Sequence, residues 1–324
     1  MESRKILYVP TPERIAGSRM TGFIQALEKA TGERFADYPE FHAYSAREFR
    51  RFWKSFLDSA SGLEWSGSNE PVCIGNQCET ARFFPNVELN YAENLLGRRI
   101  APDDAPALTS CYADGRRITY TRGELRERVL RLAQTLSELG LKPGDRVVAI
   151  MRNDGDAITV ALAAAALGAT LSTAAPENGV QAILDRFAPL EPKMMFAHTT
   201  QRQFDTGGSI SGHVAAIAAQ LPSLTDIVCL DETDLPSTVT QRQHELRALI
   251  VRGDASRFAW KRFAFNHPLF IMFSSGTTGK PKCIVHGAGG TLLEHVKEHR
   301  LHSDFGPGDK LFFHTSCSWM MWNW

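Results

Sequence analysis

Between residues 119 and 230, short apolar runs alternate with helical patterns, and this alternation constrains the fold more than any other feature of the sequence. Runs typical of buried strands lie at residues 146–151, 169–173, 193–197 and 226–230. Helical patterns separate them at residues 156–167, 177–187 and 213–220. Strands that alternate with helices form βαβ units, which place helices on both faces of a parallel sheet. We therefore predict an α/β fold with mainly parallel sheets covered by helices.

The best-defined helix follows a capping box. Thr121 can accept a hydrogen bond from a backbone N–H of the first turn, and Glu124 can reach back to the N–H of Thr121. An apolar stripe with helical spacing follows, formed by Leu125, Val129, Leu132, Leu136 and Leu139. Gly140 suits the left-handed position that ends many helices. The pattern predicts one amphipathic helix that ends near Gly140.

An aromatic helix is predicted earlier, at residues 46–57. One face is aromatic and consists of Phe49, Phe52, Trp53 and Phe56. This face is either a surface for a partner or part of the core, and we expect core packing. Residues 231–243 are polar and irregular, which predicts a surface loop.

The charge balance argues against several classes of protein. The chain has 36 Lys+Arg and 36 Asp+Glu residues, so its formal net charge is zero. Proteins that bind nucleic acids carry a basic excess that neutralises phosphates, and polybasic membrane docking needs the same excess. We expect neither partner. The longest apolar stretch, residues 157–171, is shorter than the about 20 residues that span a bilayer, so we predict a buried helix there and no membrane span.

The cysteines and the start of the chain indicate a cytoplasmic protein. The first residues lack the apolar run of about 7–15 residues that a secretory signal needs. The six cysteines form no CxxC pair, and Cys73 and Cys78 alone are weak evidence for a metal site or a disulfide. We expect reduced thiols in the cytoplasm.

A glycine-rich loop carries most of the functional information. Residues 268–273 form a buried-strand pattern, and residues 283–286 indicate a return strand. Between them, glycines allow backbone N–H groups to surround an anion, hydroxyls can donate to phosphate oxygens, and lysine supplies charge. The spacing differs from a Walker A loop, because Gly276 and Gly279 are too close together and Pro281 follows Lys280. The predicted phosphate-binding residues are Ser274, Ser275, Gly276, Thr277, Thr278, Gly279 and Lys280.

The string SSGTTGKPK, residues 274–282, resembles the signature loop of the adenylate-forming superfamily, which includes acyl-CoA synthetases, luciferases and adenylation domains of nonribosomal peptide synthesis. In that family the loop binds the β- and γ-phosphates of ATP. Residues 41–65 and 89–96 resemble the amino-terminal extension of acetyl-CoA synthetase-like enzymes. The resemblance implies an extension at residues 1–100 and, at residues 101–324, the amino-terminal part of the large AMP-binding domain.

The closing string LFFHTSCSWMMWNW, residues 311–324, is most similar to the acetoacetyl-CoA synthetase family. That similarity implies a cytoplasmic ligase of lipid metabolism that converts acetoacetate, ATP and CoA to acetoacetyl-CoA, AMP and pyrophosphate through an acyl-adenylate, with Mg²⁺. Trp319, Met320 and Trp322 are candidates for the acyl pocket, with simple core packing as the alternative. Arg186 aligns loosely with an arginine that contacts CoA in acetyl-CoA synthetases; the alternative is an exposed charge at a helix end.

Other interpretations stay open. The chain either belongs to a ligase for another short acid, such as acetate or propionate, or is a fragment that only binds. Family members are about twice this long, and their Mg²⁺ ligands, ribose-binding aspartate and adenylation lysine lie in the second half. We therefore expect an amino-terminal fragment that is inactive alone, with its catalytic residues beyond Trp324. His295, His299 and His302 have the spacing of one helical face, but no carboxylate-rich motif accompanies them and no protein-bound metal is expected.

Overall fold

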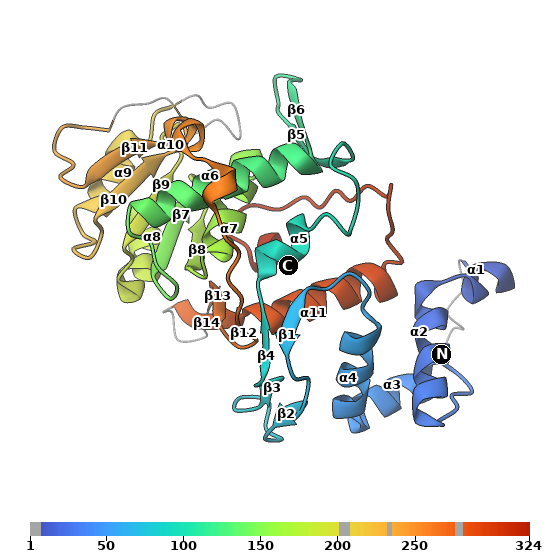
Figure 1. The fold of residues 1–324 in the computed structure, drawn as a ribbon. Coiled ribbons are helices and arrows are strands. Elements are labelled where there is room, and N and C mark those ends of the chain that lie inside the picture. The colour runs from blue at the N-terminus through green and yellow to red at the C-terminus, as the bar shows by residue number, and fades with distance from the viewer. Residues whose placement is uncertain (1–7, 201–207, 232–234, 276–280) are drawn as a thin grey trace, which may run out of the picture.

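A seven-stranded sheet forms the centre of the computed structural model, which describes residues 8–200, 208–231, 235–275 and 281–324 (Figure 1). Its strand order is β11-β10-β9-β7-β8-β13-β14. The strands are β7 (Arg146–Ile150), β8 (Thr170–Ala174), β9 (Met194–Ala197), β10 (Asp226–Cys229), β11 (Arg242–Glu245), β13 (Pro268–Ser275) and β14 (Pro281–Gly287). Neighbouring strands are parallel except for the antiparallel pair β13–β14. The predicted α/β class with a mainly parallel sheet is confirmed.

Helices cover both faces of this sheet. Val147 and Ala149 of β7 belong to the hydrophobic cluster that contains α6 (Arg122–Glu138), α7 (Gly155–Ala166) and α10 (Leu246–Arg252). Val148 and Ile150 belong to a second cluster, with α8 (Val180–Phe187) and α9 (Ser211–Ala218). Successive side chains of a strand point to opposite faces, so the continuous apolar runs of the central strands are buried on both sides.

Helix α6 forms as its sequence predicts. The backbone N–H of Glu124 donates to Thr121 Oγ1 at 3.2 Å, and the N–H of Thr121 donates to Glu124 Oε2 at 2.8 Å. The apolar stripe is buried except for Leu139, which is half-buried. Gly140 follows the helix with φ +94°, in the left-handed region that favours glycine.

The aromatic helix is interrupted, and in this respect the prediction for residues 46–57 is wrong. Helix α3 (Tyr38–Arg47) ends before Glu48, whose backbone leaves the helical region at ψ 38°, and α4 (Phe49–Ser59) begins after it. The break lets side chains of both helices meet the ring of Phe23, whose centroid lies 6.3 Å from that of Phe41 and 5.6 Å from that of Phe52. The expected core packing is confirmed for Phe52, which is buried.

Three other boundaries differ from the prediction. Strand β11 begins at Arg242, within the segment predicted as a loop, because it is an edge strand with mostly exposed side chains and no apolar pattern. Helix α8 begins at Val180, three residues later than predicted, because Gly179 is still extended at ψ 153° and forms its N-cap. Helix α9 spans Ser211–Ala218 and is displaced by two residues from the predicted range.

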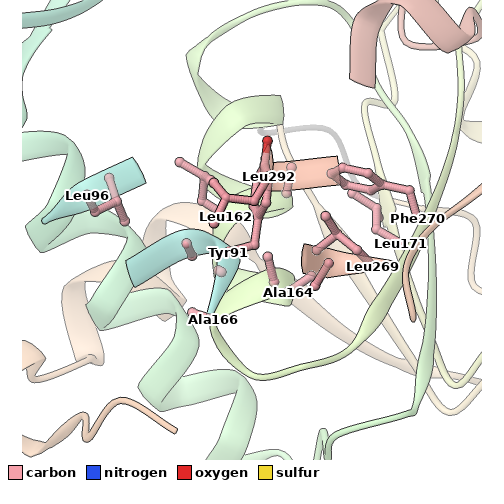
Figure 2. Close-up of a cluster of buried hydrophobic side chains, with 14 of the residues drawn as sticks. Tyr91, Leu96, Leu162, Ala164, Ala166, Leu171, Leu269, Phe270 and Leu292 are labelled. Atoms are coloured by element: carbon pink, nitrogen blue, oxygen red, sulfur yellow. The ribbon is translucent and has the colours of Figure 1, made fainter. Parts of the chain in front are cut away.

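The first part of the chain packs against the sheet domain. A small antiparallel sheet joins β1 (Trp65–Gly67), β4 (Val87–Leu89) and β12 (Phe263–Ala264), so a strand from late in the sequence pairs with two early ones. Helix α5 (Tyr91–Leu96) inserts Tyr91 between α7, β13 and α11 (Ala288–Lys297), where it lies near Leu162, Leu269 and Leu292 (Figure 2). One hydrophobic cluster therefore contains residues from both predicted parts of the chain.

The remaining elements lie outside the seven-stranded sheet. They are α1 (Pro12–Ala16), α2 (Arg19–Thr31), β2 (Cys73–Ile74), β3 (Arg82–Phe83), β5 (Pro106–Cys111), β6 (Arg117–Thr121), the 3₁₀ turns η1 (Ala188–Leu190) and η2 (Ala255–Arg257), the π-helical turn η3 (Glu298–His302) and α12 (Met320–Asn323). Across the described ranges, every helix is too short or too polar to cross a membrane.

Candidate nucleotide and acyl site

The carboxyl ends of β7, β8 and β13 meet at one edge of the sheet. Strand β8 lies on one side of β7 and β9 lies on the other, so the connections that follow β7 and β8 leave in opposite directions. In open α/β sheets such a switch point creates a crevice outside the carboxyl ends of the strands, where ligands bind. This edge is therefore the first place to look for a site.

The predicted phosphate loop leaves from this edge. Strand β13 ends at Ser275, and β14 returns antiparallel, with Ser275 opposite Pro281 and Ser274 opposite Lys282. The predicted strand and return strand are thus confirmed as an antiparallel pair. Ser274 is exposed at its base. The other predicted contacts Gly276, Thr277, Thr278, Gly279 and Lys280 lie outside the described residues, so their role stays a prediction.

The aromatic closing segment crosses the same edge. Thr173 Oγ1, on β8, donates to the carbonyl oxygen of Cys317 at 2.5 Å. The backbone N–H of Ala175, directly after β8, donates to Ser318 Oγ at 2.6 Å. These two hydrogen bonds fasten the segment to the end of β8. The predicted acyl-pocket residues that follow are therefore held beside the hairpin of the phosphate loop.

The predicted acyl-pocket residues differ in exposure. Trp319 is 65% exposed and Met320 is 48% exposed. Trp322 is half-buried and packs against the main hydrophobic cluster. A role in an acyl pocket stays a prediction for all three residues.

Arg186 lies in the same place. It is in the last turn of α8, and it lines a cavity of about 10 Å³ together with Thr173, Cys317 and Trp319. Its Nη1 donates to Asn178 Oδ1 at 3.2 Å when the amide of Asn178 is oriented to donate to Ser318 Oγ at 2.5 Å. Arg186 is half-buried, and among the described residues its Nε has no partner. The structure thus brings Arg186 to the acyl candidates, and a contact with CoA stays a prediction.

The turn after β7 contributes residues that the sequence did not single out. Asn153 Nδ2 donates to the carbonyl oxygen of Thr315 at 3.4 Å, and Trp322 Nε1 donates to Asn153 Oδ1 at 2.9 Å. The position of Asn153 directly after a predicted strand was the available signal. Its partners were not visible, because they lie more than 160 residues away in the chain.

A buried polar network holds this turn. Arg152 Nη1 donates to the carbonyl oxygen of Thr200 at 2.7 Å and lies 3.4 Å from Asp231 Oδ2. The backbone N–H of Arg152 donates to Nδ1 of the fully buried His198 at 3.1 Å. His198 Nε2 lies 3.5 Å from Asp154 Oδ2. The network joins the carboxyl ends of β7, β9 and β10.

Both carboxylates of the network are held in the charged form. Burial raises the pKa of Asp154, but the contacts with His198, the N–H of Ala157 and the charge of Arg152 together lower the pKa below its ordinary value. Burial likewise raises the pKa of Asp231, and hydrogen bonds from Thr199 and Thr200 lower it by more. The network therefore holds two ionised carboxylates at this edge, each stabilised by hydrogen-bond donors or positive charge.

A larger cavity opens beside Asn153. Its volume is about 430 Å³, and it lies between the β5–β6 hairpin, the turn after β7 and residues 312–315. Tyr112, Arg116, Phe313 and His314 are among its lining residues. This volume is within the range of small-molecule sites. The carboxyl edge of the sheet therefore has both the space and the polar groups for a ligand.

Two of the three histidines lie side by side, because the ring centroids of His295 and His299 are 6.3 Å apart. Buried His295 also forms a hydrogen bond at Nδ1 with the Tyr91 hydroxyl at 3.0 Å, whereas His302 is exposed. Helix α11 gives way after Lys297 to the wider π-helical turn, which contains His299 and His302. Within the described ranges, no three His, Cys, Asp or Glu side chains come together as a metal site.

The comparison with known families agrees with this α/β fold. The AMP-binding enzyme family matches residues 99–323, so the chain belongs to that family. The acetoacetyl-coenzyme A synthetase of Rhizobium meliloti (strain 1021) is 40% identical over 326 residues, which cover 100% of this chain and 49% of that protein. The malonamoyl-CoA synthetase of Penicillium aethiopicum is 34% identical over 320 residues, which cover 95% of this chain and 44% of that protein.

A solved structure shows the same fold. The acetoacetyl-CoA synthetase from Streptomyces lividans superposes with a TM-score of 0.91 at 33% identity, covering 98% of this chain and 49% of that one. The chain thus spans about half the length of the relatives that it matches. The phosphate loop and the closing segment predicted membership of the adenylate-forming superfamily, and this prediction is confirmed for the family and the fold.

Proposed function

We propose that the protein containing this chain is an ATP-dependent acid–CoA ligase that converts acetoacetate, ATP and CoA to acetoacetyl-CoA, AMP and pyrophosphate. The observation that carries the proposal is the closing segment, which is fastened across the carboxyl ends of β7 and β8 beside the β13–β14 hairpin. This arrangement gives one edge both a candidate phosphate loop and an apolar wall. Relatives named acetoacetyl-CoA synthetases match nearly the whole chain and support the choice of acid.

The chemistry would take two steps. In the first, the acid's carboxylate attacks the α-phosphorus of ATP, which forms an acyl-adenylate and releases pyrophosphate. In the second, the thiolate of CoA attacks the acyl carbon and expels AMP. Nucleotidyl transfer depends mostly on positioning and on neutralising phosphate charge. We assign these tasks to residues 274–280, with Thr277, Thr278 and Lys280 as the principal phosphate contacts.

We also assign residues of this chain to the acid and to CoA. Trp319, Met320 and Trp322 would form the wall for the acid, and Arg186, beside Trp319, would contact CoA. Mg²⁺ would accompany the ATP phosphates, and because the described residues contain no three-group metal cluster, we assign it no ligand in this chain. We also propose a cytoplasmic location, where the thiols of the six cysteines would stay reduced.

One relative favours a second candidate substrate. The protein from Penicillium aethiopicum is named a malonamoyl-CoA synthetase. Malonamate and acetoacetate have chains of the same length, and both carry a carbonyl group two carbons from the carboxylate. Malonamate has an amide NH₂ group where acetoacetate has a methyl group. The acyl wall would therefore accept a three-oxo acid as a class, with acetoacetate as its first member.

A comparison of acids tests the proposal. The complete gene product would be assayed for thioester and AMP with acetoacetate, malonamate, acetate and propionate at equal ATP and CoA. We expect the highest kcat/KM with acetoacetate. A higher kcat/KM with acetate or propionate would refute the choice of substrate, and a higher value with malonamate would replace acetoacetate by the second candidate.

A further inference from the structure

Asn153 forms hydrogen bonds with two residues of the aromatic closing segment, residues 311–324. Its amide nitrogen contacts the carbonyl oxygen of Thr315, and its amide oxygen accepts from the indole Nε1 of Trp322. Trp319 and Met320 lie between these two points. The side chain of Asn153, from a different part of the sequence, therefore links residues 315 and 322. We call these two hydrogen bonds the bracket.

Hydrogen bonds and an ion pair hold the residues on either side of Asn153 in place. Arg152 is tied to Thr200 and Asp231, at the ends of β9 and β10. Asp154 is 7% exposed and accepts from the N–H groups of Asp156 and Ala157, so it caps α7. A side chain that projects from a turn fixed on both sides gives its partner a defined position.

The two hydrogen bonds of Asn153 are exposed, and each uses a different end of its side-chain amide. The amide nitrogen donates to the carbonyl of Thr315, and the amide oxygen accepts from the indole of Trp322. Aspartate has the same shape but can only accept when it is ionised, and leucine has a similar shape with neither group. These two substitutions therefore separate the two hydrogen bonds.

We propose that Asn153 is a positioning residue of the acyl site, which acts through Trp322 to fix the wall formed by residues 319–322. This inference rests on the proposed function for the identity of the acid. The hydrogen bonds of Asn153 with Thr315 and Trp322 are independent of that function. Among the described residues, the hydrogen bonds of Asn153 go to Thr315 and Trp322 of the closing segment, and neither goes to Arg186. Loss of Asn153 should therefore weaken productive binding of the acid and leave binding of ATP nearly unchanged.

The first test observes the indole of Trp322 directly. The complete gene product, labelled with ¹⁵N at tryptophan, gives one indole signal that disappears in Trp322→Phe and so identifies Trp322. We expect this signal to move, and its hydrogen exchange to accelerate, in Asn153→Leu. In Asn153→Asp, which keeps the acceptor, the exchange should stay near the wild-type rate. Gln220→Ala, which removes an exposed side-chain hydrogen bond in the turn after α9, should leave the signal unchanged.

The second test separates acid from ATP. In the acetoacetate-dependent reaction, Asn153→Leu should raise KM for acetoacetate about fivefold, the effect of one lost hydrogen bond, and change KM for ATP less than about twofold. Asn153→Asp should give an intermediate KM for acetoacetate. In a Trp322→Phe background, Asn153→Leu should add little, because the two residues act as one unit.

The outcomes distinguish this inference from the proposed function. An enzyme that turns over none of the acids would refute the proposed function, whereas the indole signal would still test the bracket. An unchanged Trp322 signal in Asn153→Leu would overturn the inference. So would an active Asn153→Leu enzyme that shows equal increases in KM for acetoacetate and ATP, or a lower melting temperature with both KM values unchanged.

Discussion

The hydroxyl of Tyr91 and Nδ1 of His295 lie 3.0 Å apart in the hydrophobic core, and both side chains are more than nine-tenths buried. Burial, helped by the nearby His299 and His286 and opposed by a smaller effect of Glu298, lowers the pKa of His295 to about 4. Burial also raises the pKa of Tyr91. The pair is therefore neutral across the whole physiological range.

This pair predicts a specific loss of stability in acid. The unfolded chain protonates His295 near pH 6.5, whereas the folded protein resists protonation down to about pH 4. Between these values the unfolded state binds more protons, so stability falls as pH falls, by roughly 3 kcal/mol in total. Replacing His295 by Asn, which keeps an acceptor for Tyr91, should remove this part of the pH dependence. The measurement is the free energy of unfolding in urea at pH 7, 5.5 and 4.

The exposed His302 is the matched control. His302→Asn should keep the wild-type pH dependence. Parallel curves for the wild type and His295→Asn would show that His295 does not titrate as its burial indicates.

Two adjacent glycines in α11 predict opposite effects on stability. A Cβ at Gly289 would lie 2.3 Å from the ring of Phe265, which is 2% exposed, whereas a Cβ at Gly290 would meet nothing within 4 Å. Gly289→Ala should therefore destabilise the protein by about 1–3 kcal/mol through overpacking. Gly290→Ala should stabilise it by about 0.5–1 kcal/mol, because alanine loses less entropy in a helix. Urea unfolding of both variants checks this, and equal effects would contradict the packing of Phe265 on α11.

Lys280 is predicted from the sequence to contact ATP. Lys280→Ala in the complete gene product should slow acyl-adenylate formation by about 10²–10³, the usual loss when one charge-stabilising contact is removed from an active site. Lys310→Ala removes the same charge from an exposed position and should be nearly silent. Unchanged pyrophosphate-exchange kinetics in Lys280→Ala would remove Lys280 from the phosphate site.

Residues 1–324 expressed alone should self-associate and show no acid-dependent pyrophosphate exchange. Leu311, Phe312 and Phe313 are 61%, 86% and 52% exposed, next to exposed Trp319. Neighbouring exposed apolar side chains favour association. Phe312→Glu should reduce light scattering, whereas Val251→Glu, at an exposed position on α10, should not. A monomer that exchanges pyrophosphate with acetoacetate would contradict the predicted location of the site.

The sequence predicts local features well because local physical chemistry decides them. The helix after Thr121 carries its own cap and an unbroken apolar stripe, and it forms as predicted. The hairpin around the phosphate loop follows from a buried apolar strand and a glycine-rich turn. By contrast, β11 pairs through its backbone at a sheet edge, where Arg242 reaches Asp226 at 2.8 Å, and no apolar pattern indicates it.

The parts of the site that the sequence did not predict depend on distant contacts. The partners of Asn153 come from residues 315 and 322, and those of Arg152 come from the ends of two other strands. A pattern within one segment cannot show which turns meet after the sheet has formed. Similarly, Glu48 interrupts the aromatic helix so that rings from three helices can pack together around Phe23.

Exchange of labelled pyrophosphate into ATP by the complete gene product is the decisive test of the proposed function. Exchange should require acetoacetate, proceed without CoA and be slowed by about 10²–10³ in Lys280→Ala. Addition of CoA should then yield acetoacetyl-CoA and AMP in equal amounts. No exchange with acetoacetate, together with release of ADP and phosphate, would contradict the adenylate route and the function proposed here.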